Sequence, residues 1–222
     1  MGQHGADPPK RPVGRCRGAT LSGVPLCLSQ DADADALLDR DPFALLVGML
    51  LDQQFPMERA FAGPALLAQR LGRTELDPRE LASYDPEALV QIFRGPPAIH
   101  RYPGSMAARV QALAVAVVEQ YDGDTGLIWR DVEDGRELFR RLAALPGFGT
   151  QKAQIFTALL GKQRGVTPTG WREAAGGYGE DGSFRSVADV VDAPSLVRVR
   201  EYKQARKAEA KAGKPAAGAP KG

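Results

Sequence analysis

The sequence contains very little of the two residue types that most often bind metals. Among its 222 residues there are two cysteines and two histidines. Cys16 and Cys27 cannot supply the four thiolates of a Cys₄ zinc site or an iron–sulfur cluster. Neither His4 nor His100 has a second ligand at a known metal-binding spacing. We therefore expect no bound metal centre, and no disulfide in a reducing compartment.

Long hydrophobic runs are also missing. No apolar stretch approaches the length that crosses a bilayer, and no hydrophobic segment follows the basic residues at the N-terminus. With 43% hydrophobic and 25% charged residues, the composition is that of a globular chain of one domain or two small lobes. These features predict a cytoplasmic protein that needs no membrane.

Alternating polar and apolar residues, the signature of β-strands, are absent, whereas helix starts recur. Asp-Pro pairs at 41–42, 77–78 and 85–86 each place an N-cap residue before a proline at the first helical position. The pattern predicts an all-α fold. The longer helices are expected at residues 43–54, 57–71 with a break at Gly63-Pro64, 105–121, 135–144 and 194–212.

Both ends of the chain differ in composition from its middle. Residues 1–29 are rich in Gly, Pro and Arg, and residues 213–222 in Ala, Gly, Lys and Pro, without hydrophobic periodicity. Residues 31–197 hold 17 basic and 24 acidic residues, so the positive charge is concentrated toward the ends. We expect disordered basic tails at 1–29 and 213–222 around an ordered, acidic domain at 30–212.

One internal stretch has no acidic residue. Between Glu137 and Glu173 there are six basic residues and no Asp or Glu. This stretch is expected to be two amphipathic helices joined by Leu145–Gly149, in which two glycines permit a tight turn. The second helix starts after Gly149, and its free N–H groups favour an anion such as a DNA phosphate. An ordinary αα-hairpin with solvated basic flanks fits the spacing equally well.

The segment Leu-Pro-Gly-Phe-Gly-Thr-Gln-Lys-Ala at 145–153 resembles the hairpin of the helix-hairpin-helix DNA glycosylase superfamily, the HhH-GPD proteins of base excision repair. The resemblance covers roughly residues 42–166 in the order of that family's elements. It implies a two-lobed helical fold, with a helical barrel at about 54–164 and a second lobe from 30–53 plus 165–212. It also implies a monomer, associated with the nucleoid, that acts on double-stranded DNA holding a damaged or mispaired base.

The same resemblance implies which residues contact DNA. In the hairpin these are Gly147, Phe148, Gly149, Thr150, Gln151 and Lys152. Gln54, with Gln53 beside it, matches the glutamine that fills the gap left by an extruded base. His100 and Arg101 match a second wedge loop only loosely. No iron–sulfur cluster is implied, and at most a monovalent cation at the hairpin.

The family's catalytic residues are not at their usual places. Its lysine position is occupied by Gln151 and its catalytic aspartate position by Thr169. A bifunctional lyase is therefore not expected. The candidate carboxylates are Glu173, shortly after Thr169, and Asp52, at the end of the apolar helix. Trp171 and Tyr178, with Phe184 nearby, are the candidate lining of a base pocket.

Three functions remain open from the sequence. The first is a monofunctional DNA N-glycosylase that uses Glu173 or Asp52. The second is a non-catalytic module of the same fold that binds DNA lesions. The third is a helical interaction protein in which the hairpin is only a turn. Glu173 can equally be a surface residue, and Asp52 can be solvated or paired with an arginine.

Overall fold

The computed structural model describes residues 25–212, and within this range it contains ten α-helices, three 3₁₀ helices and no strand. The prediction of an all-α fold is confirmed. The α-helices are α1 (Ala32–Arg40), α2 (Pro42–Leu51), α3 (Met57–Leu71), α4 (Pro78–Ala82), α5 (Pro86–Arg94), α6 (Pro103–Tyr121), α7 (Gly135–Ala143), α8 (Thr150–Gln163), α9 (Trp171–Ala175) and α10 (Ala193–Ala212). The 3₁₀ helices are η1 (Thr125–Ile128), η2 (Gly176–Gly179) and η3 (Val187–Asp189).

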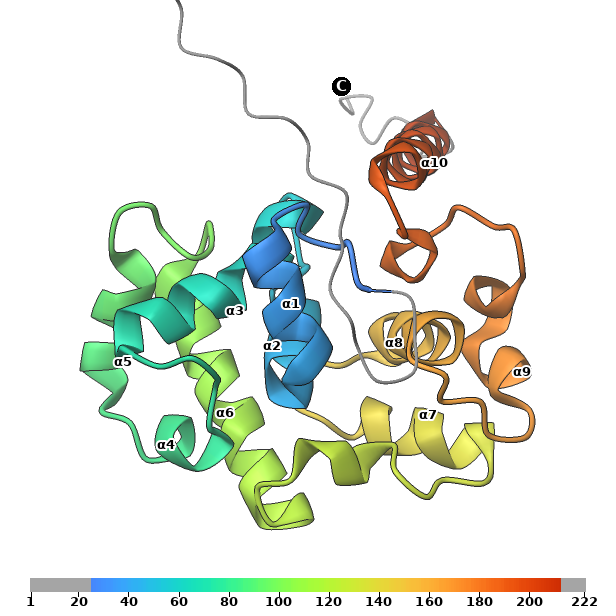
Figure 1. Ribbon diagram of the computed structural model, residues 1–222. Helices are drawn as coiled ribbons and strands as arrows, with labels where there is room; N and C mark the ends of the chain where they lie inside the picture. The colour runs from blue at the N-terminus through green and yellow to red at the C-terminus, as the bar shows by residue number, and fades with distance from the viewer. Residues whose placement is uncertain (1–24, 213–222) are drawn as a thin grey trace, which may run out of the picture.

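Helix α2 lies at the centre of the molecule. In Figure 1, α3 to α6 lie on one side of α1 and α2, and α7 to α10 lie on the other. Every residue of α2 from Phe43 to Leu51 is buried. Because burial of each large apolar side chain contributes about 1.5–3 kcal/mol, α2 holds the two groups of helices together. The end of this helix is therefore fixed in position relative to both groups.

The three Asp-Pro pairs start helices as predicted. Asp41, Asp77 and Asp85 are the N-caps of α2, α4 and α5, and each side chain accepts a hydrogen bond from a backbone N–H in the first turn. The second carboxylate oxygen of Asp41 accepts from the backbone N–H of Leu76 at 2.8 Å. These caps satisfy donors that would otherwise have no partner at the helix starts.

The predicted break at Gly63-Pro64 was wrong, because α3 runs through both residues. A Cβ atom at Gly63 would lie 2.6 Å from Leu51 Cδ1, so the glycine allows α3 to pack closely on α2. This packing keeps the helix continuous although the proline removes one backbone hydrogen bond.

The ordered chain begins earlier than residue 30. Leu26 and Leu28 are buried, and the N–H groups of Leu28 and Ser29 donate to the carboxylate of Asp35 at 3.0 and 2.8 Å. Residues 26–29 are therefore part of the core, contrary to the predicted tail. The rest of the predicted tails, 1–24 and 213–222, lies outside the described residues. The division into two lobes stays a prediction.

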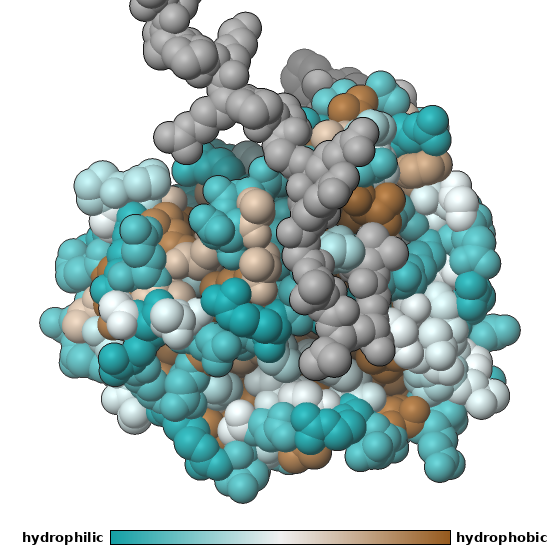
Figure 2. Space-filling model, in the orientation of Figure 1, coloured by the Kyte–Doolittle hydropathy of each residue, from teal (hydrophilic) through white to brown (hydrophobic). Residues whose placement is uncertain are grey.

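Most of the face shown in Figure 2 is hydrophilic, with hydrophobic residues in separate patches. In the range 25–212, no helix combines the length and the apolar character needed to cross a membrane.

Candidate functional site

The predicted hairpin joins α7 and α8 and packs against the end of α2. Gly147 has φ +83°, and a Cβ atom there would lie 2.4 Å from Leu50 Cδ1. Both observations require glycine at this position. Gly149 has φ −76°, which any residue can adopt, so of the two glycines only Gly147 uses the backbone freedom of glycine. The hairpin turn thus depends on Gly147 and on its contact with α2.

The N-terminus of α8 is open to an anion. Its N-cap is Gly149, no side chain caps it, and a Cβ atom at Gly149 would meet nothing within 4 Å. The exposed residues Thr150 and Gln151 follow in the first turn. Their N–H groups belong to the orphan donors at the positive end of the helix dipole.

The side chain of Phe148 does not face the same way as this open turn. It is 3% exposed, and its ring packs 6.0 Å from that of Phe156. DNA contact at Phe148 stays a prediction, and with the side chain buried it would have to involve the backbone. Its ring anchors the hairpin to the core and leaves only its backbone at the turn.

Lys152 ties the hairpin to α2. Its Nζ donates to the carbonyl oxygens of Met49 and Leu50, each at 2.8 Å. These carbonyls belong to the last turn of α2, where the helix itself supplies no partner. Burial lowers the pKa of Lys152 to about 8, although the negative charge of Asp52 works against this shift. Lys152 is thus a cap for α2 supplied by another helix.

Asp52 lies in a cleft between the end of α2 and the hairpin. Its side chain is 14% exposed, and one carboxylate oxygen is 3.8 Å from Nζ of Lys203 in α10. The cleft has a volume of about 660 Å³. It is lined by Met49, Asp52, Gln53, Gln54, Phe55, Gly147, Gly149, Thr150, Gln151, Lys152, Ile155 and Lys203. Asp52 is therefore paired with a lysine rather than an arginine, beside the predicted DNA-binding hairpin.

The two glutamines after Asp52 differ in their surroundings. Gln53 is half-buried, and its Oε1 accepts a hydrogen bond from Arg109 at 2.7 Å. Gln54 is exposed and has φ +53°, a backbone conformation that residues other than glycine seldom adopt. Such strain persists only where the surrounding structure holds it, and it is concentrated at functional sites.

His100 supports the loop that contains Gln53 and Gln54, and its side chain is fully buried. Its Nδ1 accepts from the N–H of Tyr102 at 3.1 Å, so Nε2 carries the proton and donates to the carbonyl of Gln53 at 3.1 Å. Burial lowers the pKa of His100. His100 thus joins residues 53–55 to residues 100–102, and its direct contact with DNA stays a prediction.

Arg101 is exposed, and its guanidinium lies over the ring of Tyr102 at 5.4 Å. It borders a second cleft of about 340 Å³ on the other side of Gln54. This cleft is lined by Gln54, Phe55, Pro56, Arg59, Ala98, His100 and Arg101. Gln54 therefore lies between the two clefts and is exposed. A side chain that inserts into DNA must be exposed in this way.

Glu173 and Trp171 lie away from the cleft. Glu173 is exposed in the first turn of α9. Trp171 is 6% exposed and packs on α8, where a Cβ atom at Gly161 would be 2.4 Å from its ring. Gly161 is about 16 Å along α8 from Thr150, at 1.5 Å per residue. The ring of Trp171 therefore belongs to the core, and its role in a base pocket stays a prediction. Thr169 bonds through its backbone to Glu133 and Gly135.

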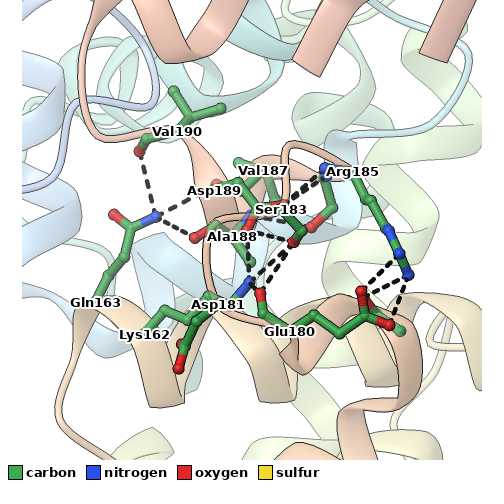
Figure 3. Close-up of polar contacts among 12 residues, drawn as sticks. Lys162, Gln163, Glu180, Asp181, Ser183, Arg185, Val187, Ala188, Asp189 and Val190 are labelled. Carbon is green, nitrogen blue, oxygen red and sulfur yellow. Dashed lines mark hydrogen bonds and ion pairs between the residues drawn. The ribbon is translucent and has the colours of Figure 1, made fainter. Parts of the chain in front are cut away.

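The segment after α9 returns along α8 toward the hairpin, and Tyr178 lies nearest to it. The Tyr178 hydroxyl accepts a hydrogen bond from Gln151 Nε2 at 2.8 Å. Figure 3 shows the polar network that holds this segment. In it, Lys162 pairs with Asp189 at 2.6 Å, and Arg185 pairs with Glu180 at 2.6 Å. These carboxylates thus have structural partners at the opposite end of α8.

Phe184 is half-buried, with the guanidinium of Arg198 over its ring at 4.7 Å.

Two residues of the site were not predicted from the sequence. Lys203 lines the cleft and Arg109 holds Gln53. The basic composition of α10 was a signal for the first, but it did not show which residue reaches Asp52.

No group of three or more His, Cys, Asp or Glu side chains that could hold a metal ion occurs within residues 25–212. The expectations about an iron–sulfur cluster and a monovalent cation stay predictions.

Comparison with known proteins gives one family. Residues 47–215 match the model of the HhH-GPD superfamily base excision DNA repair proteins. No curated protein and no solved structure matches the chain. The matched region is more than half of the sequence and contains the end of α2, the hairpin and α10. The chain therefore belongs to the HhH-GPD superfamily of base excision DNA repair proteins.

Proposed function

We propose that the protein is a monofunctional DNA N-glycosylase that excises a damaged or mispaired base and uses Asp52 as its carboxylate. The observation that carries this proposal is the position of Asp52. It lies in the same cleft as the open N-terminus of α8, with Lys152 and Lys203 on either side and Gln54 at the rim. Glu173 lines no part of that cleft.

The chemistry of base excision needs a carboxylate at such a place. A negative charge near the sugar stabilises the oxocarbenium-like transition state, or the carboxylate activates a water molecule that attacks C1′. The target nucleotide must first leave the base stack. Gln54 is exposed beside the cleft and fits the role of filling the vacated space, while the α8 N-terminus binds the strand through a phosphate.

Lys152 supports the absence of a lyase step. Both hydrogen bonds of its Nζ go to α2 carbonyls, so attack of this amine on a sugar would first have to break them. Gln151, at the family's lysine position, has an amide that cannot form a Schiff base. The reaction proposed is therefore hydrolysis of the glycosidic bond alone, which leaves an intact abasic strand.

A non-catalytic lesion-binding module is the second candidate. It is favoured by the ion pair between Asp52 and Lys203, which gives the carboxylate a structural partner, and by Thr169 at the family's aspartate position. In this case the two clefts bind an extruded or abasic nucleotide without cleaving it.

Single-turnover assays distinguish the two candidates. Duplexes containing uracil, alkylated purines or oxidised guanine are incubated with the protein and then treated with alkali, which breaks the strand at abasic sites. We expect Asp52→Asn to lower the rate on the preferred lesion by about 10²–10⁴-fold, the usual contribution of an acid–base group. Glu173→Gln is the matched control and should leave the rate unchanged.

The absence of breaks across the whole panel would reject the glycosylase. If lesion duplexes are then still bound more tightly than undamaged DNA, and Asp52→Asn keeps that preference, the protein is the non-catalytic module. A rate that survives Asp52→Asn but is lost in Glu173→Gln would move the catalytic role to Glu173.

A further inference from the structure

The last helix, α10, changes character along the side that faces the rest of the molecule. Near its start, Leu196 and Val199 are buried against the body. Helical spacing of i, i+4, i+7 and i+11 from Leu196 continues this side through Arg200, Lys203 and Lys207. A helix that packs on a core keeps apolar residues on its inner face. Here the inner face becomes cationic after its second turn.

Two ion pairs fix where this cationic side lies. Arg200 pairs with Glu58 in the first turn of α3, and Lys203 Nζ lies 3.8 Å from Asp52 at the end of α2. Lys203 lines the cleft together with Thr150 and Gln151 of the hairpin. The cationic side of α10 therefore begins at the edge of the cleft. All residues of α10 from Arg200 to Glu209 are exposed.

The charge of α10 is strongly positive. The helix has the basic residues Arg198, Arg200, Lys203, Arg206, Lys207 and Lys211 and the acidic residues Glu201 and Glu209. Residues 31–197 are acidic overall. Beyond Val199, α10 presents exposed positive charges next to the cleft. Such a surface favours an anionic partner over an apolar one, because burial of unpaired charges against apolar groups is costly. A DNA backbone supplies a row of regularly spaced anions.

We infer that α10 is a second DNA-backbone-binding element, which binds phosphates through Lys203 and Lys207 on the side of the cleft opposite the hairpin. The hairpin and α10 then hold the DNA from two sides, with Gln54 and Asp52 between them. This inference rests on duplex DNA as the partner in the proposed function. It assigns to α10 a role that neither the hairpin nor the wedge residues provide.

The salt dependence of DNA binding tests it. Each phosphate contact contributes about −0.9 to the slope of log K against log salt concentration. The variant Lys203→Gln/Lys207→Gln should bind undamaged duplex more weakly than the unaltered protein, with a slope less negative by about 1.8. Arg79→Gln/Arg198→Gln removes the same charge and is the control. Arg79 is in α4, far from α10 in Figure 1, and Arg198 lies over Phe184 on another side of α10. Its slope should remain that of the unaltered protein.

Amide hydrogen exchange provides a readout that does not depend on a variant. In the unaltered protein, exchange across residues 200–209 should slow when duplex DNA is added. An unchanged slope in Lys203→Gln/Lys207→Gln, or unchanged exchange with DNA bound, would overturn the inference and leave the hairpin as the binding element. If the two substitutions weakened the binding of polyglutamate to the protein but not the binding of DNA, α10 would be assigned to an acidic protein partner instead. Failure of the unaltered protein to bind any duplex would overturn the proposed function as well.

Discussion

Nζ of Lys152 lies 2.8 Å from the carbonyl oxygen of Leu50, and this contact joins the hairpin to the helix that Asp52 caps and that Gln54 follows. The residues come from α8 and α2, about a hundred positions apart in the chain. A movement of the hairpin must therefore move the end of α2 or break this hydrogen bond. The hairpin and the end of α2 are thus held together by Lys152.

The buried position of Lys152 predicts a specific pH dependence of stability. Its pKa is about 8 in the folded protein and about 10.4 in an unfolded chain. Between these values the unfolded state binds more protons, so the free energy of unfolding rises with pH, by up to about 1.4 kcal/mol per pH unit from this group. Urea titrations of the unaltered protein and of Lys152→Met between pH 7.5 and 10.5 should differ by this slope. Parallel curves would contradict it.

Substitution of the two hairpin glycines should affect stability to different degrees. Gly147→Ala must accept φ +83° and displace Leu50, so we expect a loss of about 1–3 kcal/mol in unfolding free energy. Gly149→Leu has an allowed φ and open space, so stability should change by less than about 1 kcal/mol.

The leucine side chain in Gly149→Leu would nevertheless lie over the N-terminus of α8 and keep a phosphate away. We expect Gly149→Leu to lose at least about tenfold in duplex affinity, equal to about 1.4 kcal/mol. Denaturation and DNA titration of the same samples measure both quantities. Unchanged affinity would exclude the hairpin as a phosphate site.

Gln54 is predicted to lower stability in exchange for its position between the two clefts. Replacement by glycine removes the strain of φ +53° and should leave stability unchanged or raise it by about 1 kcal/mol. The same change removes the side chain that we propose fills the gap in DNA, so lesion excision and lesion affinity should both fall. In Gln54→Asn the new residue adopts positive φ more readily, but its side chain is one methylene shorter. This variant therefore distinguishes the effect of side-chain length from the effect of backbone strain. Full activity in the glycine variant would show that Gln54 is not a wedge.

His100 should make the stability of the loop at residues 53–55 depend on pH in the acidic range. Because burial lowers its pKa, the unfolded state binds more protons just below pH 6.5, and stability falls as the pH decreases through that range. Protonation of Nδ1 also breaks its hydrogen bond from Tyr102. Protection factors at residues 53–55 and 101–102, which correct the exchange rate for the intrinsic effect of pH, should therefore fall between pH 7 and 5. The variant His100→Phe should lack this pH dependence, although its protection is lower at every pH.

Local signals in the sequence determined much of this protein. Asp-Pro caps fixed the starts of α2, α4 and α5, and the acid-free stretch with Leu145–Gly149 placed the hairpin, because caps and tight turns depend on neighbours in the chain. The same motif identified the family. The expectation of a break at Gly63-Pro64 failed because packing of Gly63 on Leu51 outweighs the local effect of a proline.

Only the tertiary structure decided which of the candidate residues share a site. Asp52 and Glu173 were equivalent as carboxylates in the sequence, but Asp52 lines the cleft where α2 ends at the hairpin, whereas Glu173 lines no part of it. The sequence did not show that the side chains of Phe148, His100 and Trp171 are buried, because a side chain's direction depends on what packs around it. Lys152 and Lys203 reach α2 across 102 and 151 positions of the chain, distances over which no local pattern carries information.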